Sequence, residues 1–395
     1  MSFLDRHISS TRLIRTYNAS TVLQTLYRYG SCSRSQLTKL TGMSPATITR
    51  IVAELIEQGI VLEGRVGKST GGRRPVYVHI DYTKLYLVSI KLLRDDCSVA
   101  LLDLRGQILS KNKMTPADFN PNPLIQDVIL AVENLLRDCQ INREHILGVG
   151  VAISGVVRSE VGLMVNSVNL GWKNVPIAEL LGRDLDLPIY VENDANASAL
   201  AEFWFGNAKD TANSMYIKTE TGAGVGIIIG KTLVSGPRFM TGEIGHVPLV
   251  QNGRPCRCGQ RGCLETYVYL DDVLARYREM TAKAVSRSAF IELIHNGHHS
   301  ASEIVGETAQ ALAFACAHWG VLLDLDVITI GGFWGGLKKE IIDYCQKYYN
   351  EVLEKTGIPR QIKITNASFG DDTDLLGAAG LVIDRWFVPF PVLER

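Results

Sequence analysis

The first 60 residues carry apolar side chains at the spacing of amphipathic helices. Over residues 21–29 they share one helical face: Val22, Leu23, Leu26 and Tyr27. Residues 33–40 predict a second, short helix with Ser33 as its cap, and Ser44 with Pro45 marks the start of a third. The third helix buries Ile48, Ile51, Val52, Leu55 and Ile56. Two helices joined by a short turn predict a helix-turn-helix.

The third helix presents small and polar side chains near its N-terminus, the end that meets base edges in such motifs. These candidate DNA contacts are Ala46, Thr47, Thr49 and Arg50. Two β-rich runs over residues 60–80 then flank a Gly-rich basic loop, which is the pattern of a wing whose cations contact phosphates. The cations of the loop are Arg65, Lys68, Arg73 and Arg74.

Charge strengthens this interpretation. The chain has 41 basic and 41 acidic residues, but residues 1–80 hold eleven Lys or Arg against four Asp or Glu, a balance of +7. The remaining residues carry a net charge of −7. A basic end on an acidic body points to nucleic acid as a partner. The alternative is a small helical domain with a solvated basic loop; the wing and the charge together favour a DNA-binding domain over residues 1–80.

After Asp81 the pattern changes to alternating strands and helices. Short apolar runs predict strands at 85–93, 97–104, 106–114, 146–155, 188–194, 214–230 and 326–332. Helices are predicted over 123–139, from about Ala195, and over 303–322. We expect two α/β lobes, a small one over 81–194 completed by a C-terminal helix over 381–395, and a large one over 195–380. Ligands in such folds bind where strand ends face a cleft.

Composition limits the class of protein. With 395 residues and 46% hydrophobic residues, the chain can form two or three packed domains. The longest apolar candidate, 146–157, is too short to span a bilayer, and the first fifteen residues contain no apolar stretch of signal-peptide type. We therefore expect a cytoplasmic protein without membrane insertion. Three of the eight cysteines lie within residues 256–263, and clustered thiols in a reducing compartment more often bind metal than form disulfides.

Five motifs together resemble the ROK family of repressors and sugar kinases. They are ENDANASALAE at 192–202, GEIGH at 242–246, CRCGQRGCLE at 256–265, NLGW at 169–172 and TIGG at 329–332. The resemblance covers essentially the whole chain, because a winged-helix head occurs in the repressor branch, of the N-acetylglucosamine-repressor and Mlc type. It implies an actin-like (ribonuclease H-like) two-lobed body with a sugar cleft between the lobes.

One histidine and three cysteines form a candidate metal site that suits tetrahedral Zn²⁺ with no open coordination position: His246, Cys256, Cys258 and Cys263. The resemblance implies that these are zinc ligands. Reduced structural thiols are the alternative. We expect one structural Zn²⁺ per chain that shapes the sugar pocket, because His246 ends the turn that carries Glu243 and Cys263 lies two residues before Glu265.

Several side chains are candidates for sugar contact. Asn193 and Asp194 follow a strand and precede a helix, where a carboxylate can accept a sugar hydroxyl; the resemblance implies that Asp194 matches the catalytic base of the kinases, and helix capping is the alternative. The resemblance also implies sugar contacts for Glu243, His246 and Glu265. Asn169 is a weaker candidate, because an Asn in this position can simply form a turn.

The chain departs from the family's kinases at the first phosphate turn. There the kinases carry an Asp, a glycine-rich turn and a Thr, whereas this chain has Lys91-Leu92-Leu93-Arg94-Asp95. Without glycine the backbone cannot approach a phosphate closely. The second turn, TGAGVG at 221–226, keeps its glycines, which a tight hairpin also requires. We therefore expect no enzymatic activity, with Asp194 as a vestigial base.

These patterns predict a sugar-responsive transcriptional regulator that represses genes of carbohydrate uptake or metabolism. Its expected partners are operator DNA, a small sugar or sugar-phosphate effector, and further copies of the chain in a homodimer or homotetramer. Two alternatives stay open. One is a sugar kinase with an appended DNA-binding head, and the other is a regulator controlled by a protein partner that masks the head.

Overall fold

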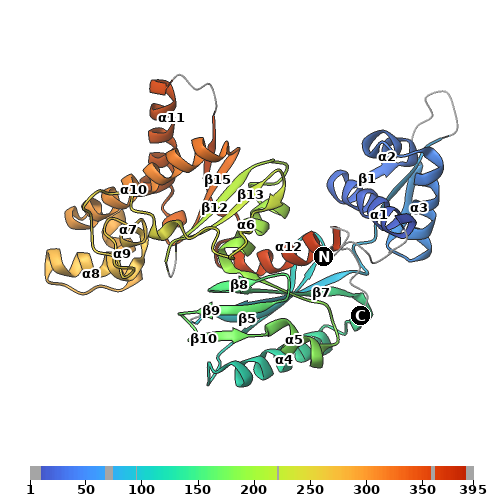
Figure 1. Cartoon of the computed structure of the whole chain (residues 1–395), viewed down its shortest axis with the longest axis horizontal. Helices are drawn as coiled ribbons and strands as arrows, with labels where there is room; N and C mark the ends of the chain where they lie inside the picture. Colours follow the sequence, from blue (N-terminus) through green and yellow to red (C-terminus); the bar gives the residue numbers. More distant parts are fainter. Residues whose placement is uncertain (1–9, 67–73, 95, 220–221, 357–360, 388–395) are drawn as a thin grey trace, which may run out of the picture.

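The structure is a computed structural model that describes residues 10–66, 74–94, 96–219, 222–356 and 361–387. Figure 1 shows a small N-terminal head and two α/β lobes, with the last helix lying between the lobes. No helix within these described ranges is long and apolar enough to cross a bilayer. The expected class, a winged helix-turn-helix followed by a two-lobed α/β body, is confirmed.

The head forms the helices that its apolar spacing predicts. Its elements are α1 (Ser10–Tyr29), β1 (Ser31–Ser33), α2 (Arg34–Thr41), α3 (Pro45–Glu57), β2 (Val61–Val66) and β3 (Val76–Ile80). Ser33 caps α2 in a capping box with Gln36, and Ser44 caps α3 by accepting from the backbone N–H of Thr47 at 3.2 Å. β3 pairs antiparallel with both β1 and β2, so the predicted wing strands lie side by side.

The first lobe is built on a five-stranded sheet in the order β11-β7-β4-β5-β6. Its strands are β4 (Tyr86–Leu92), β5 (Cys97–Asp103), β6 (Ile108–Met114), β7 (Ile146–Ile153) and β11 (Ile189–Asn193). β4, β7 and β11 are parallel, and β5 and β6 extend the sheet antiparallel. α4 (Pro121–Asp138), preceding a short 3₁₀ turn (Arg143–His145), and α5 (Ile177–Leu185) pack against each other below this sheet (Figure 1).

A small three-stranded sheet between β7 and α5 was not predicted. It consists of β8 (Val156–Arg158), β9 (Leu163–Ser167) and β10 (Trp172–Val175), all antiparallel. Its strands are short and only partly buried, so they carry little of the alternation that reveals a strand in sequence. The NLGW motif forms the loop and first residue that join β9 to β10.

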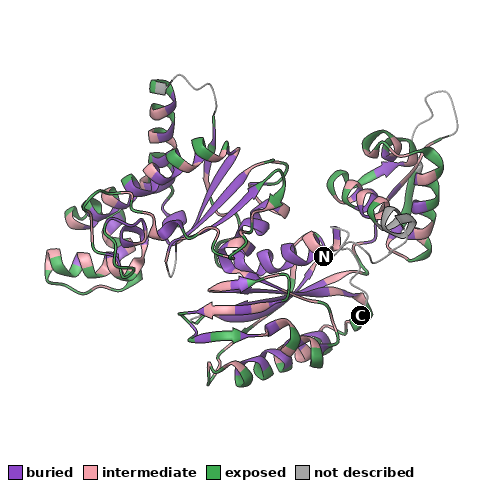
Figure 2. Ribbon diagram, viewed as in Figure 1, coloured by how far each residue is buried: buried purple, intermediate pink, exposed green. Residues whose placement is uncertain are grey.

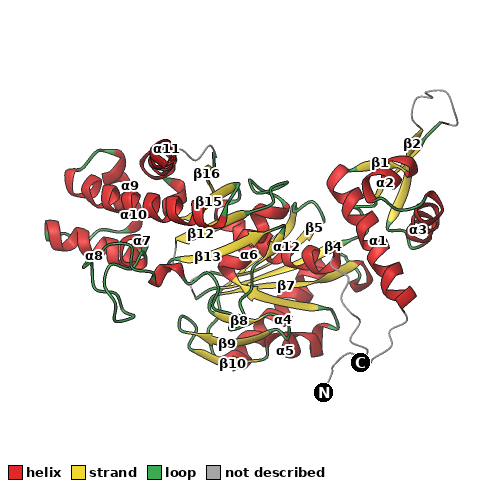
Figure 3. Ribbon diagram, turned by 45° about the horizontal axis from the view of Figure 1, so that its top comes forward, coloured by secondary structure: helices red, strands yellow, loops and turns green. Residues whose placement is uncertain are grey.

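The second lobe repeats the topology of the first. Its sheet has the order β14-β13-β12-β15-β16, with strands β12 (Ser214–Thr219), β13 (Gly224–Ile229), β14 (Thr232–Leu233), β15 (Val327–Gly332) and β16 (Lys363–Asn366). As in the first lobe, two strands extend it antiparallel on one side of its first strand and two run parallel on the other. Figure 3 shows the strands of both sheets, in yellow, near the middle of the two-lobed body, with helices around them.

Helices gather at the outer end of the second lobe. They are α7 (Glu265–Val268), α8 (Leu270–Thr281), α9 (Arg287–His295), α10 (His299–Leu323) and α11 (Tyr344–Thr356). Short helical segments lie between the sheet and these helices: Ile244–His246, Trp334–Gly336 and a π-helical segment at Lys338–Asp343. A further turn, Gly370–Asp372, precedes the last helix. The buried face of α10 and the apolar side chains of β12 and β15 form the core of this lobe, which appears purple in Figure 2.

Two helices lie between the sheets. α6 (Asp194–Trp204) packs on β12 and β13, and α12 (Thr373–Phe387) packs on β4 and β7 and against α6. The helix predicted over 381–395 therefore begins eight residues too late. The small residues of its first turns, including Gly377 and Gly380, obscured the helical pattern, and in the structure they allow the close approach to α6. Residues 388–395 lie outside the described residues.

Candidate functional site

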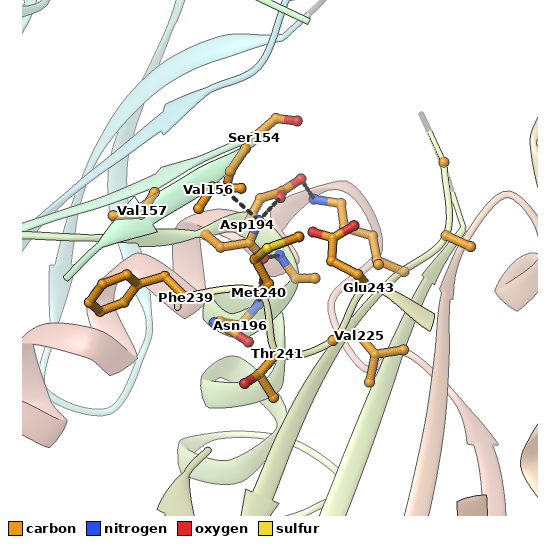
Figure 4. A pocket seen from close by; sticks show the side chains of 18 of the residues that line it. Ser154, Val156, Val157, Asp194, Asn196, Val225, Phe239, Met240, Thr241 and Glu243 are labelled. Carbon is orange, nitrogen blue, oxygen red and sulfur yellow. Dashed lines mark hydrogen bonds and ion pairs between the residues drawn. The ribbon is translucent and has the colours of Figure 1, made fainter. Parts of the chain in front are cut away.

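A polar pocket of about 570 Å³ opens between the two lobes. Figure 4 shows its walls, with Ser154 and Val156 from the first lobe and Val225, Phe239 and Glu243 from the second. All six candidate sugar ligands line it: Asn169, Asn193, Asp194, Glu243, His246 and Glu265. The structure thus brings together residues that lie up to 96 positions apart in the sequence, and their contact with a sugar stays a prediction.

Asp194 is the first residue of α6, and the capping role belongs to its neighbour. The side-chain oxygen of Asn193 accepts from the backbone N–H groups of Ala195 and Asn196 at 2.9 and 3.2 Å. The Asn193 amide also donates to Gly155 O at 3.0 Å and to Asp194 Oδ1 at 3.1 Å. The cap therefore holds Asn193 in place, and the Asp194 carboxylate is directed into the pocket (Figure 4).

Glu192, which sequence reasoning did not single out, holds Asn193 and Asn196 in place through hydrogen bonds. Its carboxylate accepts from Ser159 Oγ at 2.6 Å, Asn196 Nδ2 at 3.0 Å and the backbone N–H of Asn193 at 2.8 Å. Burial raises the pKa of Glu192, although these three donors oppose the increase. The strand PIYVEND gave no signal for this role, because the partner Ser159 comes from the unpredicted β8–β9 hairpin.

A buried ion-pair network joins the lobes behind the pocket. Lys218 Nζ lies 3.0 Å from Asp194 Oδ2 and 2.6 Å from Asp374 Oδ1. Lys91 Nζ lies 3.3 Å from Asp374 Oδ2 and 2.7 Å from Asp96 Oδ2. Lys91, Lys218, Asp194 and Asp374 are 3, 6, 7 and 4% exposed, so water screens these pairs little. Burial alone would raise the pKa of Asp374, but Lys218 and Lys91 lower it below its ordinary value.

This network follows the repeated topology. Lys91 and Lys218 are the penultimate residues of β4 and β12, the first strands of the two sheets. Asp194 and Asp374 lie in the first turns of α6 and α12, the helices that follow the fifth strand of each sheet. Asp374 bridges one lysine from each lobe, so a single carboxylate ties the two lobes together.

The structure describes part of each candidate phosphate turn. Leu93 is buried and pairs with Asp96 through two backbone hydrogen bonds of 3.3 Å, which close a tight turn; Asp95 lies outside the described residues. In the second turn, a Cβ on Gly226 would overlap the carbonyl of Ala195, and one on Gly224 would lie 3.1 Å from the Ala195 Cβ. These glycines therefore serve the packing of β13 on α6. Glu220 and Thr221 lie outside the described residues.

The cysteine cluster sits at the edge of the pocket. Cys256 Sγ lies 3.7 Å from His246 Nδ1, and Cys258 Sγ lies 3.7 Å from Cys263 Sγ. His246, Cys256 and Cys258 have their ligand atoms within 4.8 Å of one another, so they could hold a metal ion. Tetrahedral Zn²⁺ with bonds of about 2.0–2.3 Å separates its ligand atoms by about 3.5–3.8 Å. The two separations of 3.7 Å match this spacing, whereas Cys263 lies next to Cys258 but outside the group of three residues whose ligand atoms are all within 4.8 Å of one another.

The candidate DNA contacts lie on the outer side of the head. Ala46, Thr49 and Arg50 are exposed on α3, and Thr47 is partly exposed. The hydroxyl of Thr49 donates to Pro45 O at 2.8 Å, so it is held against its own helix. Arg74 is exposed just before β3; Arg73 and Lys68 lie outside the described residues.

Comparisons with known proteins cover both parts of the chain. The model of the ROK family matches residues 87–385, and that of the MarR family matches residues 16–62. A putative xylose repressor from Caldicellulosiruptor sp. (strain Rt8B.4) is 25% identical over 94% of this chain and 96% of its own length. The Escherichia coli K12 protein named DNA-binding transcriptional dual regulator NagC is 27% identical over 82% of this chain and 77% of its own.

Solved structures agree. A ROK family transcriptional regulator described as a homolog of the E. coli MLC protein superposes with a TM-score of 0.83, at 25% identity, over 95% of this chain and 97% of its own. A ROK hexokinase from Thermus thermophilus shares the fold of the body, with a TM-score of 0.66 at 24% identity over 75% of this chain and 97% of its own. The family model spans the whole two-lobed body, and the chain belongs to the ROK family.

Proposed function

We propose that this protein is a sugar-responsive transcriptional repressor without enzymatic activity. One observation carries the proposal: the chain joins an exposed helix-turn-helix to an interlobe pocket, and the buried Lys91 occupies the position where the resemblance implies a metal-binding acid in the kinases. Relatives named as xylose and N-acetylglucosamine repressors support it. Such a protein acts in the cytoplasm, where its DNA is.

The pocket supports a sugar as the effector. A sugar presents several hydroxyl donors, and the pocket offers carboxylate acceptors from both lobes in Asp194, Glu243 and Glu265. The Asn193 and Asn169 amides also line the pocket. Asn169 Nδ2 donates to Ser154 Oγ at 3.0 Å, so its carbonyl oxygen can still accept.

The charges of the pocket favour a neutral sugar over a sugar phosphate. Of the cations that line it, Lys218 is paired with two aspartates, and Arg257 lies 3.3 Å from Asp272 and stacks on the ring of Tyr269. The carboxylates of Asp194, Glu243 and Glu265 would repel a phosphate placed among them. We therefore assign the effector to the neutral monosaccharides.

The cysteine cluster is proposed as a structural zinc site, with one ion per chain held by His246, Cys256, Cys258 and Cys263. A closed shell of four protein ligands leaves no position for a reactive water, so the ion would supply cross-linking rather than catalysis. The neighbouring chain carries Glu243 and Glu265. Fixing the ligands therefore fixes the two carboxylates in the pocket wall.

Free sugars are expected to raise the melting temperature and release the protein from DNA, whereas phosphorylated sugars are not. The test compares D-xylose, D-glucose and N-acetyl-D-glucosamine with xylose 5-phosphate and glucose 6-phosphate by thermal shift and isothermal titration. Asp194→Asn should weaken binding by about 1.5–3 kcal/mol, because a charged acceptor is lost. Asp138→Asn, an exposed change at the end of α4, is the matched control.

The kinase alternative makes the opposite prediction for the same samples. Sugar-dependent ATP consumption that disappears in Asp194→Asn would favour an enzyme with an appended head. Melting-temperature shifts by phosphorylated sugars alone would overturn the assignment of a neutral effector. Regulation by a masking protein partner would appear as release from DNA that no sugar reproduces.

The head is expected to hold DNA largely through phosphates, probed with a duplex that the protein itself selects from a random library. Replacing Arg73 and Arg74 by Ala should weaken binding to all sequences and flatten the dependence of log K on log salt by about two units, one per lost phosphate contact. Arg50→Ala should instead reduce discrimination between sequences. A double change of Lys347 and Lys355 to Ala on α11 is the control. An unchanged salt slope would contradict the wing assignment.

A homodimer or homotetramer is part of the proposal, because helix-turn-helix proteins read paired half-sites. A dimer places two heads on one operator, and a change in lobe closure would alter their spacing. Binding that requires two half-sites at a fixed spacing, measured with duplexes of varied spacer length, would support it.

A further inference from the structure

Two helices run from the pocket to the head. α6 begins at Asp194 in the pocket and ends at Trp204, and α12 carries Asp374 in its first turn and ends at Phe387. At 1.5 Å per residue they span about 16 and 22 Å. Figure 1 shows α12 lying along the interface between the lobes and pointing towards the head. The same two helices therefore extend from the proposed sugar pocket to the DNA-binding head.

The two helices are joined into one unit. Ser198 Oγ on α6 donates to Asp374 Oδ1 on α12 at 2.8 Å, in the buried interior. A Cβ on Gly377 would overlap the carbonyl of Ala197, and one on Gly380 would lie 3.2 Å from Leu200 O. Backbones this close cannot slide past each other without losing their packing. A displacement of one helix is therefore shared by the other.

At the head, both helices end against α1. The ring of Tyr27 lies 5.7 Å from that of Trp204 and 5.2 Å from that of Phe387, and Trp204 and Phe387 are 5.6 Å apart. We call these three residues the aromatic junction. Tyr27 Oη also donates to Leu104 O at 2.7 Å, and the Phe387 carbonyl accepts from Gln24 Nε2 at 2.9 Å. The ends of α6 and α12, together with Leu104 after β5, therefore contact α1 of the head.

The aromatic junction contains a buried donor that lacks an acceptor. Trp204 Nε1 is shielded from solvent and has no hydrogen-bond partner among the residues that the structure describes. A buried N–H without an acceptor is unfavourable, and most such groups in folded proteins are paired. The arrangement seen here is therefore not optimal for Trp204, and a shifted head could satisfy it.

At the pocket, the Asp194 carboxylate is shared. Oδ2 binds Lys218, and the residue also lines the space where a sugar would lie. A sugar hydroxyl that donates to Asp194 competes with Lys218, which also pairs with Asp374 on α12. Occupancy of the pocket therefore changes the balance of ion pairs at the first turns of both helices.

We propose that α6 and α12 act as one unit that couples the sugar pocket to the position of the DNA-binding head, with the buried ion pairs at one end and the aromatic junction at the other. The inference rests on the proposed function and adds the structural route by which the sugar pocket would affect the head. Coupling of this kind is a free energy between two sites, so each ligand must change the affinity for the other by the same factor.

The test measures that factor in the full-length chain. The dissociation constant for a duplex selected from a random library is determined with and without saturating D-xylose or D-glucose. The dissociation constant for the sugar is determined with and without the duplex. Wild type should show a change of about tenfold or more, equal in both directions. In Trp204→Ala and Phe387→Leu the factor should fall towards one, while each ligand alone binds within about threefold of wild type. Phe290→Leu, a buried ring in the second lobe, is the control.

Phe387→Leu keeps an apolar side chain and removes the ring that meets Tyr27 and Trp204, so it is decisive if Trp204→Ala folds poorly. A factor that stays at the wild-type value in Phe387→Leu and in folded Trp204→Ala overturns the coupling route. Loss of the factor in Phe290→Leu as well overturns it too, because general destabilisation then explains the effect. A coupling factor of one in the wild type, with both ligands bound, would contradict the sugar response itself and therefore also the coupling route.

Discussion

Cys258→Ser is expected to release the metal and abolish the sugar response, while the head still binds DNA. Cys258 Sγ lies 3.7 Å from Cys263 Sγ, and a serine oxygen is a poor replacement for a zinc thiolate. Zinc content should fall from about one per chain to near zero after gel filtration. The affinity for sugar should fall by a factor of about ten or more. The head shares no ligand with the cluster, so its fold should persist. Atomic absorption, titration with D-xylose and DNA binding measure the three effects.

Cys139→Ser is the matched control, because Cys139 is a partly buried thiol at the end of α4, outside the cluster. It should keep its zinc and its sugar response. Wild-type protein that contains no zinc would show that the cluster is not a metal site. Metal-free protein that binds sugar normally would show that the ion does not shape the pocket.

The head could be predicted closely because its signals are local. Ser33 and Ser44 cap their helices and Pro45 occupies the first position of α3, as the sequence indicates. These features depend on residues at most four positions apart, which a sequence displays directly. The start of α1 was predicted eleven residues too late, because its first half lacks the apolar periodicity on which the prediction relied.

The body was predictable in class and less so in detail. Its buried strands read as apolar runs, but β8 to β10 are too short and too exposed to show a pattern. α12 was misplaced because its glycines and alanines fill a close contact with α6 rather than forming an apolar stripe. Helix propensity depends on the residues of the local chain, whereas the small residues of α12 are explained by its packing against α6.

The site divides in the same way. Motifs indicated the six candidate sugar ligands, which line one pocket, and the cysteine cluster, of which His246, Cys256 and Cys258 have their ligand atoms within 4.8 Å of one another. The ion-pair network had no such signal, because Lys218 and Asp374 are 156 positions apart. The sequence showed that Lys91 replaces an acid, and this predicted a lost phosphate site. It did not reveal that the lysine has a buried carboxylate as its partner.

Asp374→Asn is expected to lower the free energy of unfolding by about 3 kcal/mol, the lower end for breaking a buried ion pair. The amide leaves two buried lysines, although Lys218 keeps Asp194 and Lys91 keeps Asp96. Urea unfolding of the full chain measures the loss. Glu179→Gln, which breaks the exposed Arg183–Glu179 pair on α5, should change stability little. An equal loss in both variants would contradict a special role for the network.

The pH dependence separates charge from packing in that loss. Burial opposes ionisation of Asp374, yet Lys218 and Lys91 keep its pKa below the ordinary value. A carboxyl group with a lower pKa in the folded than in the unfolded protein stabilises the fold above its unfolded pKa of about 3.9, and this contribution is lost as the pH falls through the folded value. The difference between wild type and Asp374→Asn should therefore be steady between about pH 7 and 5 and shrink below about pH 4. A difference that stays undiminished in acid would mean that the asparagine disturbs packing, and that the ion pairs do not hold the lobes together.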